Sequence, residues 1–342
     1  MNTNNTMTPY FMVIMSEIKR CYEVWKQLPI EVYYAVKCNH NPILLEYMAS
    51  LGIKFDCASK KELEEVLKVA PASSIVYANP CKAIDHIQYA KEQEVPVLVF
   101  DCECELDKIK EHYPTCRLLL RIWVKNTKGS PLSKKFGAKN ALPLLKRAQE
   151  LGLNVIGLSF HVGSACAEPS LYYEALKQCH DIVEVAPYLE VIDIGGGFKL
   201  DSFSECAAEV RRGMELLPGK RFIAEVGRFL VETSHTLYVQ VICKKKDGNQ
   251  RTYYINDGLY GSFSCKVLDH ATPLLQTIKK GELFPSTVYG PTCDSMDMVE
   301  ECLLPELEVG DTIFIEKMGA YTTASASAFN GFEVKDFIYI HE

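Results

Sequence analysis

The stretch VYYAVKCNHNPILLEYMAS at residues 32–50 combines an apolar run with a segment of helical character. In residues 32–37, β-branched and aromatic side chains follow one another without a polar interruption, which is typical of a strand buried on both faces. In residues 42–50, apolar residues recur at helical spacing. The stretch therefore predicts one β-strand followed by one α-helix.

The same pattern of strand and helix recurs along the first two thirds of the chain. Compact apolar runs predict eight strands, at 32–37, 54–58, 75–79, 97–101, 117–124, 155–162, 191–195 and 221–225. Amphipathic segments between them predict helices, among them 42–50, 61–69, 141–151 and 171–185. Parallel strands need crossover helices, so eight such units predict a closed (β/α)8 barrel. The alternative is a doubly wound open sheet, which more often has about five to seven strands and an early glycine-rich fingerprint.

Beyond about residue 230 the pattern changes to strand-like runs without long helices between them. These runs lie at 237–243, 252–255, 312–315 and 337–340. We therefore expect a barrel over residues 13–233 and an all-β domain over residues 234–342, which residues 1–12 are expected to join. The predicted fold class is α/β, a (β/α)8 barrel followed by a C-terminal all-β domain.

Composition restricts the partners and the compartment. The chain has 342 residues and a formal net charge of −7, and its one basic run, 244–246, is short. This balance argues against a nucleic-acid or anionic-membrane partner, and the run is better explained as a solvated hairpin end. Because the chain lacks the roughly 20 consecutive apolar residues of a membrane span and starts with the polar MNTNN, we expect a cytoplasmic protein. The fourteen cysteines include no C-x-x-C pair, so we expect reduced thiols and no metal site.

Polar residues gather at the carboxyl ends of the predicted barrel strands, where such barrels hold their active sites. The set comprises Lys37, Asp56, Arg121, His161, Ser164, Gly195, Gly196, Gly197, Glu225 and Arg228. Burial of Lys37 at the end of an apolar strand would lower the pKa of its ammonium group, which suits imine formation. The alternative is a lysine that extends its charged end past the strand into water.

Three further features each have a functional and a structural explanation. The glycines at 195–197 let a backbone approach an anion and present its N–H groups, but a tight turn uses the same residues. Glu225 at a buried strand end needs a cationic partner, either a protonated pyridine nitrogen or Arg228 three residues later. His161 either stacks on a planar cofactor or is a core histidine with satisfied hydrogen bonds.

Ten stretches, in this order, resemble the ornithine decarboxylase family of pyridoxal-phosphate enzymes. They are YYAVKCN (33–39), FDCASKKE (55–62), YANPCK (77–82), KKFGA (134–138), SFHVGS (159–164), DIGGGF (193–198), EVGRF (225–229), LYGSF (259–263), YGPTCDSMD (289–297) and MGAYT (318–322). The resemblance covers nearly the whole chain. It implies an alanine-racemase-like barrel with a C-terminal β-domain, and pyridoxal 5′-phosphate as cofactor.

The resemblance also implies a role for each residue of the cofactor site. Lys37 would form a Schiff base with the cofactor, Glu225 would pair with its pyridine nitrogen, and His161 would stack on its ring. Asp56 and Arg121 would contribute to the same site. The residues implied to hold the phosphate are Ser164, Gly195, Gly196, Gly197, Arg228 and Tyr321.

For the substrate, the resemblance implies a head-to-tail homodimer in which Cys293 and Asp294 reach the active site of the other subunit. Cys293 would return a proton to the α-carbon. Asp269 and Asp294, together with Tyr260, would bind the distal ammonium of ornithine, so that the products are putrescine and carbon dioxide.

Alternatives to this function remain. Two carboxylates in the pocket favour a basic amino acid, and lysine or arginine could replace ornithine as substrate. A non-catalytic regulator similar to antizyme inhibitors and an amino acid racemase are alternatives from other classes. An antizyme-like inhibitor is a further candidate partner.

The chain departs from the family's usual pattern at three places. It has Val226 where proline is common, Ala165 where glycine is common, and Phe198-Lys199-Leu200 in place of FPG. None of these changes removes a functional group. Each is expected to alter loop rigidity and hence the affinity for the cofactor.

Overall fold

The computed structural model describes residues 8–126, 132–334 and 336–341. Residues 1–7 of the segment expected to join the β-domain therefore lie outside the described residues. The chain divides into two compact units, Tyr22–Phe229 on the one hand and Met1–Cys21 with Leu230–Glu342 on the other.

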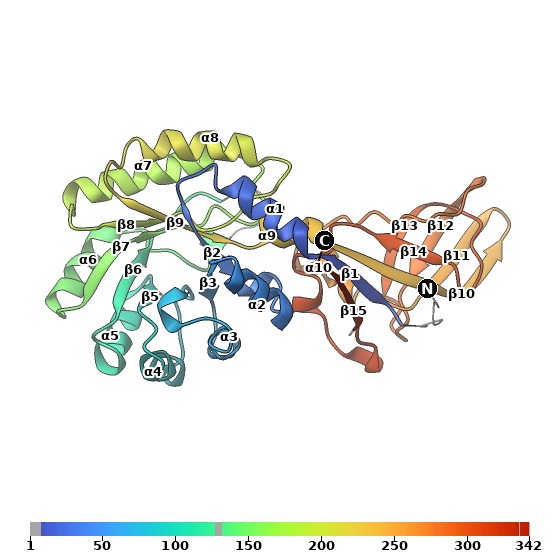
Figure 1. Cartoon of the computed structure of the whole chain (residues 1–342), viewed down its shortest axis with the longest axis horizontal. Coiled ribbons are helices and arrows are strands. Elements are labelled where there is room, and N and C mark those ends of the chain that lie inside the picture. The colour runs from blue at the N-terminus through green and yellow to red at the C-terminus, as the bar shows by residue number, and fades with distance from the viewer. Residues whose placement is uncertain (1–7, 127–131, 335, 342) are drawn as a thin grey trace. The chain divides into compact units, whose positions relative to one another are not determined.

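The first unit contains a closed barrel of eight parallel strands (Figure 1). The strands are β2 (Glu31–Ala35), β3 (Lys54–Cys57), β4 (Ile75–Tyr77), β5 (Val97–Phe100), β6 (Arg117–Arg121), β7 (Asn154–Ser159), β8 (Val191–Asp193) and β9 (Arg221–Val226). The pairing of β2 with β9 closes the barrel. All eight predicted strands are confirmed, although all except β9 end one to three residues earlier than expected. Val124, Val162 and Ile194 are buried in the loops that follow, so the apolar pattern extends beyond the hydrogen-bonded strands.

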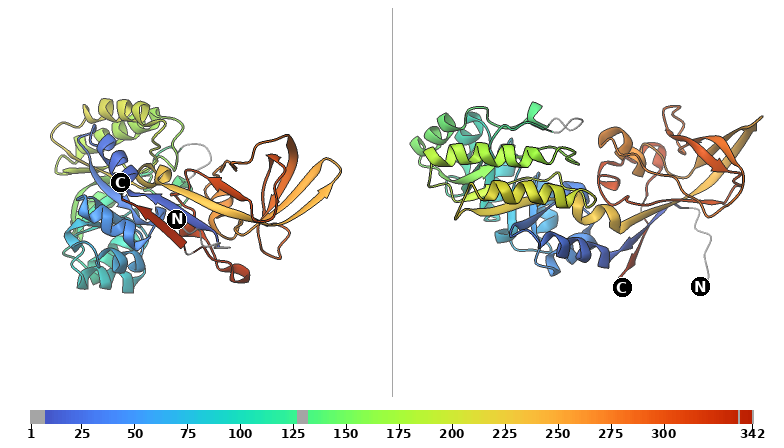
Figure 2. Two further views of the ribbon diagram at one scale, coloured as in Figure 1. Left: turned by 45° about the vertical axis from the view of Figure 1, so that its right-hand side comes forward. Right: turned by 90° about the horizontal axis from the view of Figure 1, so that it is seen from above.

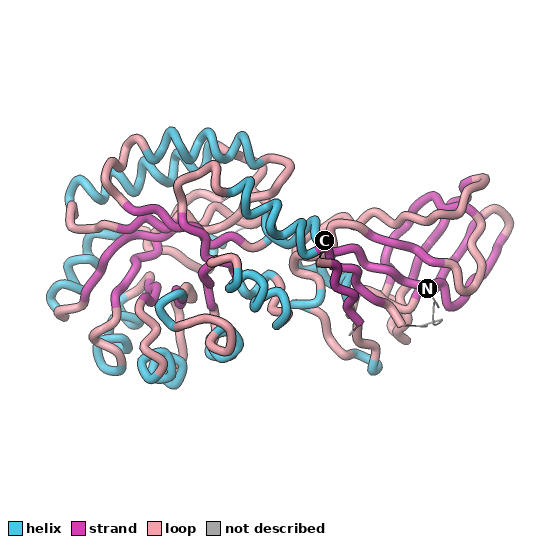
Figure 3. The backbone as a smooth tube through the Cα atoms, in the orientation of Figure 1, coloured by secondary structure: helices cyan, strands magenta, loops and turns pink. Residues whose placement is uncertain are grey.

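Helices surround these strands, as the cyan and magenta segments of Figure 3 show. They are α2 (Pro42–Ser50), α3 (Lys60–Val66), α4 (Ile84–Glu92), α5 (Glu103–His112), α6 (Ala141–Glu150), α7 (Ser170–Val185) and α8 (Phe203–Met214). Two more helices, α1 (Met15–Trp25) and α9 (Arg228–Val231), contain the boundaries between the two units. The start of α3 illustrates why they begin where they do. The Ser59 hydroxyl accepts from the amide of Glu62, and the Glu62 carboxylate accepts from the amide of Ala58. This reciprocal cap satisfies two amides that the first helical turn leaves without partners.

Side chains fill the barrel interior in layers. The interior holds an apolar cluster that includes Tyr33, Val76, Val97, Val99, Leu119, Val191 and Ile223. Since side chains alternate between the two faces of a strand, residues two positions along point to the same side. Arg121, Asp193 and Glu225 therefore face inward at the carboxyl ends, and Arg117 and Arg221 face inward at the amino ends.

The second unit is built on a seven-stranded mixed sheet. Its strands are β1 (Tyr10–Ile14), β10 (His235–Asp247), β11 (Gln250–Ile255), β12 (Leu283–Tyr289), β13 (Met298–Pro305), β14 (Thr312–Ile315) and β15 (Asp336–Ile340), and it also contains the short helix α10 (Cys265–Leu268). The left view of Figure 2 shows β1 between β10, to which it is antiparallel, and β15, to which it is parallel. The sequence did not reveal β12 and β13, because Pro285 and the pair Glu300-Glu301 interrupt their strand pattern.

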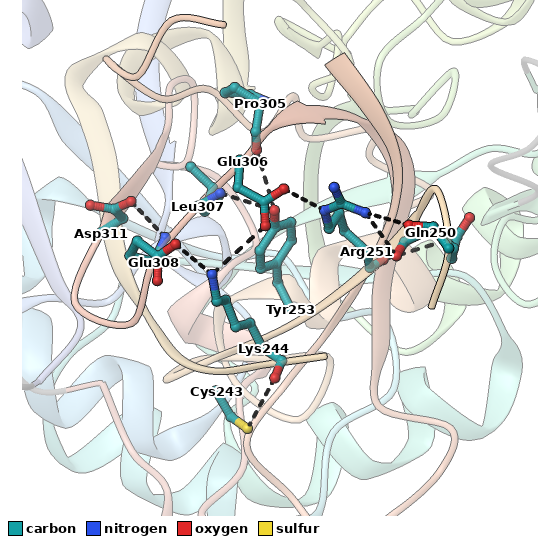
Figure 4. A network of polar contacts seen from close by, with 11 residues as sticks. Cys243, Lys244, Gln250, Arg251, Tyr253, Pro305, Glu306, Leu307, Glu308 and Asp311 are labelled. Atoms are coloured by element: carbon teal, nitrogen blue, oxygen red, sulfur yellow. Dashed lines mark hydrogen bonds and ion pairs between the residues drawn. The ribbon is translucent and has the colours of Figure 1, made fainter. Parts of the chain in front are cut away.

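A polar network joins the β10–β11 hairpin to the chain that follows β13 (Figure 4). The buried Arg251 donates from Nε to Glu306 at 2.6 Å, and Lys244 donates to Glu308. The hydroxyl of Tyr253 bonds to the main chain of the same segment. One lysine of the basic run 244–246 is therefore neutralised within the protein, and the run lies at the hairpin, as predicted.

Two general properties bear on the expected compartment. All fourteen cysteines have free thiols, and eight of them are buried. Within the described parts of the chain, no helix combines the length and the apolar surface needed to cross a lipid bilayer.

Candidate active site

Lys37 lies just past the end of β2, in the short 3-10 turn Val36–Cys38. Its Nζ donates to Oδ2 of Asp56 at 2.6 Å. Asp56 is completely buried, whereas the lysine side chain is 41% exposed. Of the two alternatives that the sequence left open for Lys37, the structure agrees with a side chain that extends past the strand end, because the residue lies in the turn beyond β2. The amine is open to a ligand and is anchored to a buried acid.

Three buried carboxyl groups, Asp56, Asp193 and Glu225, lie at the carboxyl ends of β3, β8 and β9. Burial, and then the charge of Asp56, raises the pKa of Asp193 to about 7 and the pKa of Glu225 well above its ordinary range. The positive charges of Lys37 and Arg121 lower the pKa of Glu225 again but do not cancel this rise. Buried acids in such surroundings favour the binding of a further cation.

The glycines at 195–197 form the turn after β8. Gly195 has a φ of +65° and Gly197 a φ of +105°, in the left-handed region that favours glycine. A Cβ on any of the three would lie 2.2–2.5 Å from a main-chain carbonyl oxygen of a neighbouring loop or strand of the same chain, so the tight turn itself requires glycine. Within the described residues, the amides of Gly196 and Gly197 donate to no other group of the chain. The turn therefore also leaves two N–H groups for an anion.

His161 follows β7 by two residues, and its ring is held in place. Its Nδ1 accepts from the amide of Gly163 at 2.9 Å, and its carbonyl accepts from Asn126 at 2.7 Å. Burial, and then the charges of Arg121 and Lys37, lowers the pKa of His161 well below its ordinary range. The ring is therefore neutral at physiological pH, and the hydrogen bond from Gly163 assigns its proton to Nε2.

Ser164 and Arg228 come together at the rim of the barrel. The buried guanidinium of Arg228 donates from Nη2 to the Ser164 hydroxyl at 3.4 Å. Ala165, next in sequence, has a φ of +49°, in the left-handed region that favours glycine. For a residue with a Cβ this costs about 1–2 kcal/mol.

Tyr260 and Asp294 lie together in the second unit. The amide of Met296 donates to Oδ1 of Asp294 at 3.0 Å, and the Tyr260 hydroxyl donates to Oδ2. These two bonds lower the pKa of Asp294, so that its carboxylate stays charged. The adjacent Cys293 is exposed, and its amide donates to the Asn330 side chain at 3.0 Å.

The other two predicted residues of this unit lie in turns. Asp269 is partly exposed and follows α10, where its amide donates to the carbonyl of Cys265 at 3.0 Å. Tyr321 is partly exposed and has a φ of +57°, which is rare for an aromatic residue.

Two buried acids that the sequence did not single out, Asp193 and Asp297, accept hydrogen bonds from nearby main-chain amides. Asp193 accepts from the amide of Gly195 at 2.9 Å and ends an apolar strand, which is the signal that identified Glu225. Asp297 is buried, and its Oδ2 accepts from both the amide and the hydroxyl of Thr292, at 3.1 and 2.7 Å. It is the second acid of the C-D-x-x-D stretch, so its position in that motif was the available signal.

Comparisons with known proteins agree with this geometry. The sequence model of the family described as "Pyridoxal-dependent decarboxylase, pyridoxal binding domain" matches residues 15–232. The ornithine decarboxylase of Schizosaccharomyces pombe is 40% identical over 97% of this chain and 83% of that protein. The antizyme inhibitor 2 of Xenopus laevis is also 40% identical, over 95% of this chain and 79% of that protein. Among solved structures, the arginine decarboxylase of Paramecium bursaria Chlorella virus has a TM-score of 0.95 at 32% identity, covering 98% of this chain and 97% of that one.

Proposed function

The chain belongs to the family of pyridoxal-dependent decarboxylases that includes ornithine decarboxylase, and we propose on this premise that it converts L-ornithine to putrescine and carbon dioxide. Pyridoxal 5′-phosphate is the cofactor. The observation that carries the proposal is the pairing of an accessible amine, Lys37, with a buried acid cluster that favours one more cation. When bound, the cofactor supplies an electron sink for the electron pair that remains when the substrate carboxylate leaves.

The residues at the barrel rim fit the phosphate of this cofactor. The amides of Gly196 and Gly197 supply two N–H donors, and the guanidinium of Arg228 supplies a charged donor beside the Ser164 hydroxyl. Amides and an arginine are the donors that phosphate groups prefer in proteins. Tyr321 adds a hydroxyl to this set in our proposal.

The buried acids and the lysine fit the rest of the cofactor. The Glu225 carboxylate would accept a hydrogen bond from the protonated pyridine nitrogen, whose positive charge would offset the burial that raises the pKa of its carboxyl group. Lys37 would hold the cofactor through Nζ, which donates to Asp56 at 2.6 Å, and Asp56 would orient that amine. His161 would contact the ring as a neutral group, and Arg121 would contribute positive charge nearby.

Specificity for a basic substrate rests on residues of the second unit. Asp294 carries a negative charge and is oriented by Tyr260, and together with Asp269 it binds the distal ammonium of ornithine. Cys293 delivers a proton to the α-carbon through its exposed thiol, which favours the amine over a transaminated product.

Product analysis tests this function against its alternatives. The purified protein with pyridoxal phosphate is expected to release one carbon dioxide and one putrescine for each L-ornithine consumed. A regulator similar to antizyme inhibitor 2 would give no product, and a racemase would give D-ornithine without carbon dioxide. Either result would contradict the proposal.

We further propose that the protein is a cytoplasmic homodimer in which each subunit lends Cys293 and Asp294 to the site of the other. Seven large apolar side chains of the second unit are at least 60% exposed, namely Val267, Leu268, Leu274, Ile278, Met296, Leu303 and Val309. So much exposed apolar surface favours a protein partner. The free thiols favour a reducing compartment such as the cytoplasm.

Mixing two inactive variants tests the shared site. Lys37→Ala and Cys293→Ala homodimers are each expected to be inactive. After subunit exchange, half of the dimers in an equal mixture carry one intact site out of two, so about a quarter of the wild-type activity should return. The measurement is carbon dioxide release, with exchange followed by mass spectrometry of tagged subunits. Complete exchange without recovered activity would exclude a site that is shared in this way.

A further inference from the structure

The amino-terminal end of the barrel, opposite the rim described above, holds a cavity of about 170 Å³. This is at least ten times the roughly 10–15 Å³ that a single water requires. Apolar residues of the interior cluster line it, among them Val76 and Leu119. None of the residues that line the cavity belongs to the candidate active site, so the two are separate spaces.

All of the charged side chains that line this cavity are cations. They are Lys54, Arg117 and Arg221, each the first residue of its strand, β3, β6 or β9. Arg117 and Arg221 stand two residues before Leu119 and Ile223, so strand alternation directs them to the barrel interior. Interior layers of such barrels are normally dominated by branched apolar residues. The three cations, which are partly exposed, therefore form a positively charged end to an otherwise apolar interior.

One carboxylate, that of Glu31, partly neutralises the positive charge of these three cations. Glu31 accepts from Lys54 at 2.9 Å through Oε1 and from Arg221 through Oε2. Arg117 has no ion pair within the described residues. Three positive charges against one negative charge leave the cavity with an excess of two, in a chain whose formal net charge is −7.

Neutral donors complete the lining. The Tyr33 hydroxyl lies 3.4 Å from Nη2 of Arg221, and Ser73 lines the same cavity. Burial raises the pKa of Tyr33, so its hydroxyl keeps its proton and can donate. Guanidinium groups form paired hydrogen bonds with planar or tetrahedral oxyanions.

From this arrangement we propose that the amino-terminal end of the barrel binds a small oxyanion with two negative charges, of which inorganic phosphate is the simplest. Two negative charges match the excess of two positive charges, and Arg117 is the principal contact. The site is distinct from the phosphate site of the cofactor, because the two lie at opposite ends of the strands.

Titration calorimetry of the holoenzyme with inorganic phosphate tests this site, because bound cofactor already occupies the other phosphate site. We expect one phosphate per chain with a dissociation constant of about 1 mM or below. Arg117→Gln should weaken binding at least about tenfold, since it removes the unpaired cation. Arg147→Gln is the matched control, because Arg147 is exposed on α6, pairs with Asp107 and does not line the cavity.

The visible spectrum of the holoenzyme, recorded during the titration, shows whether phosphate acts at the cofactor instead. Lys54→Gln is a second cavity variant, which is used if Arg117→Gln is unstable. Absence of binding to the wild-type protein, equal affinity in the cavity variants and in Arg147→Gln, or loss of the cofactor on phosphate addition would each overturn the proposal.

Discussion

Substitution of Lys37 by alanine is expected to remove the visible absorption band of the cofactor-loaded protein and to lower ornithine decarboxylation by about 10³-fold or more. Lys37 has its Nζ 2.6 Å from a buried acid while its side chain is accessible, which is the arrangement that covalent attachment of a cofactor requires. Another rim lysine, Lys82, is completely buried and donates to Glu105 and to the carbonyl of Val99. The amine of Lys82 is therefore already bonded within the protein interior and cannot replace that of Lys37.

The matched control for this variant is Lys61→Ala, which removes an exposed lysine from the surface of α3. It should keep both the absorption band and the activity. Spectra of the wild-type protein and both variants after dialysis against pyridoxal phosphate give the readout. A band in Lys37→Ala as strong as that of the wild type would assign the covalent attachment to a different residue.

Substitution of Glu225 by glutamine is expected to lower kcat by about a hundredfold or more, with the cofactor still bound. Glutamine has nearly the same shape and leaves the main-chain bond between Glu225 and Gly195 in place. It cannot carry the negative charge that stabilises a protonated pyridine nitrogen. The matched control is Glu111→Gln, an exposed position on α5 where the kinetics should not change. Wild-type kcat in Glu225→Gln would remove this residue from the mechanism.

Glu225 also gives the cofactor-free protein a characteristic pH dependence. Burial raises the pKa of Glu225 in the folded state well above its ordinary range, and it raises the pKa of Asp193 to about 7. The folded state therefore binds protons more tightly than the unfolded state. Stability is then highest below the unfolded carboxyl pKa of about 4 and falls as the pH rises through the folded pKa values. Glu225→Gln should flatten this fall, as measured by urea unfolding between pH 5 and pH 8. A pH dependence identical to that of the wild type would contradict the burial account.

The barrel could be predicted from sequence because its strands are apolar over their whole length and alternate with amphipathic helices. The positions of Glu225 and Arg121 followed from the same pattern, since a charged residue that ends an apolar strand lies at the rim. The sequence left open whether Lys37 is buried or extends past the strand, because the answer depends on a 3-10 turn that begins one residue earlier.

Long-range pairings were also beyond the sequence pattern. Tyr260 and Asp294 are 34 positions apart and meet only because of how the second unit folds. The cations at the amino ends of β3, β6 and β9 appear in the sequence as ordinary surface residues. They become a cluster only when the barrel closes and strand alternation turns them inward.

The proteins that this chain resembles differ in the activity that their names state, so the preferred substrate has to be measured. The chain has similar identity to an ornithine decarboxylase and to an antizyme inhibitor, and it superposes closely on an arginine decarboxylase. The retention of Lys37, His161 and Glu225 favours catalysis, whereas preference among basic amino acids depends on Asp269 and Asp294 and on the space beside them.

The most direct test of the account is a comparison of kcat/KM for carbon dioxide release from carboxyl-labelled L-ornithine, L-lysine and L-arginine by the cofactor-loaded protein. We expect ornithine to be preferred at least about tenfold over both longer substrates, because one additional methylene, as in lysine, changes kcat/KM by about this factor or more, and the guanidine of arginine is larger still. A higher kcat/KM for lysine or arginine, or no release from any of the three, would contradict it.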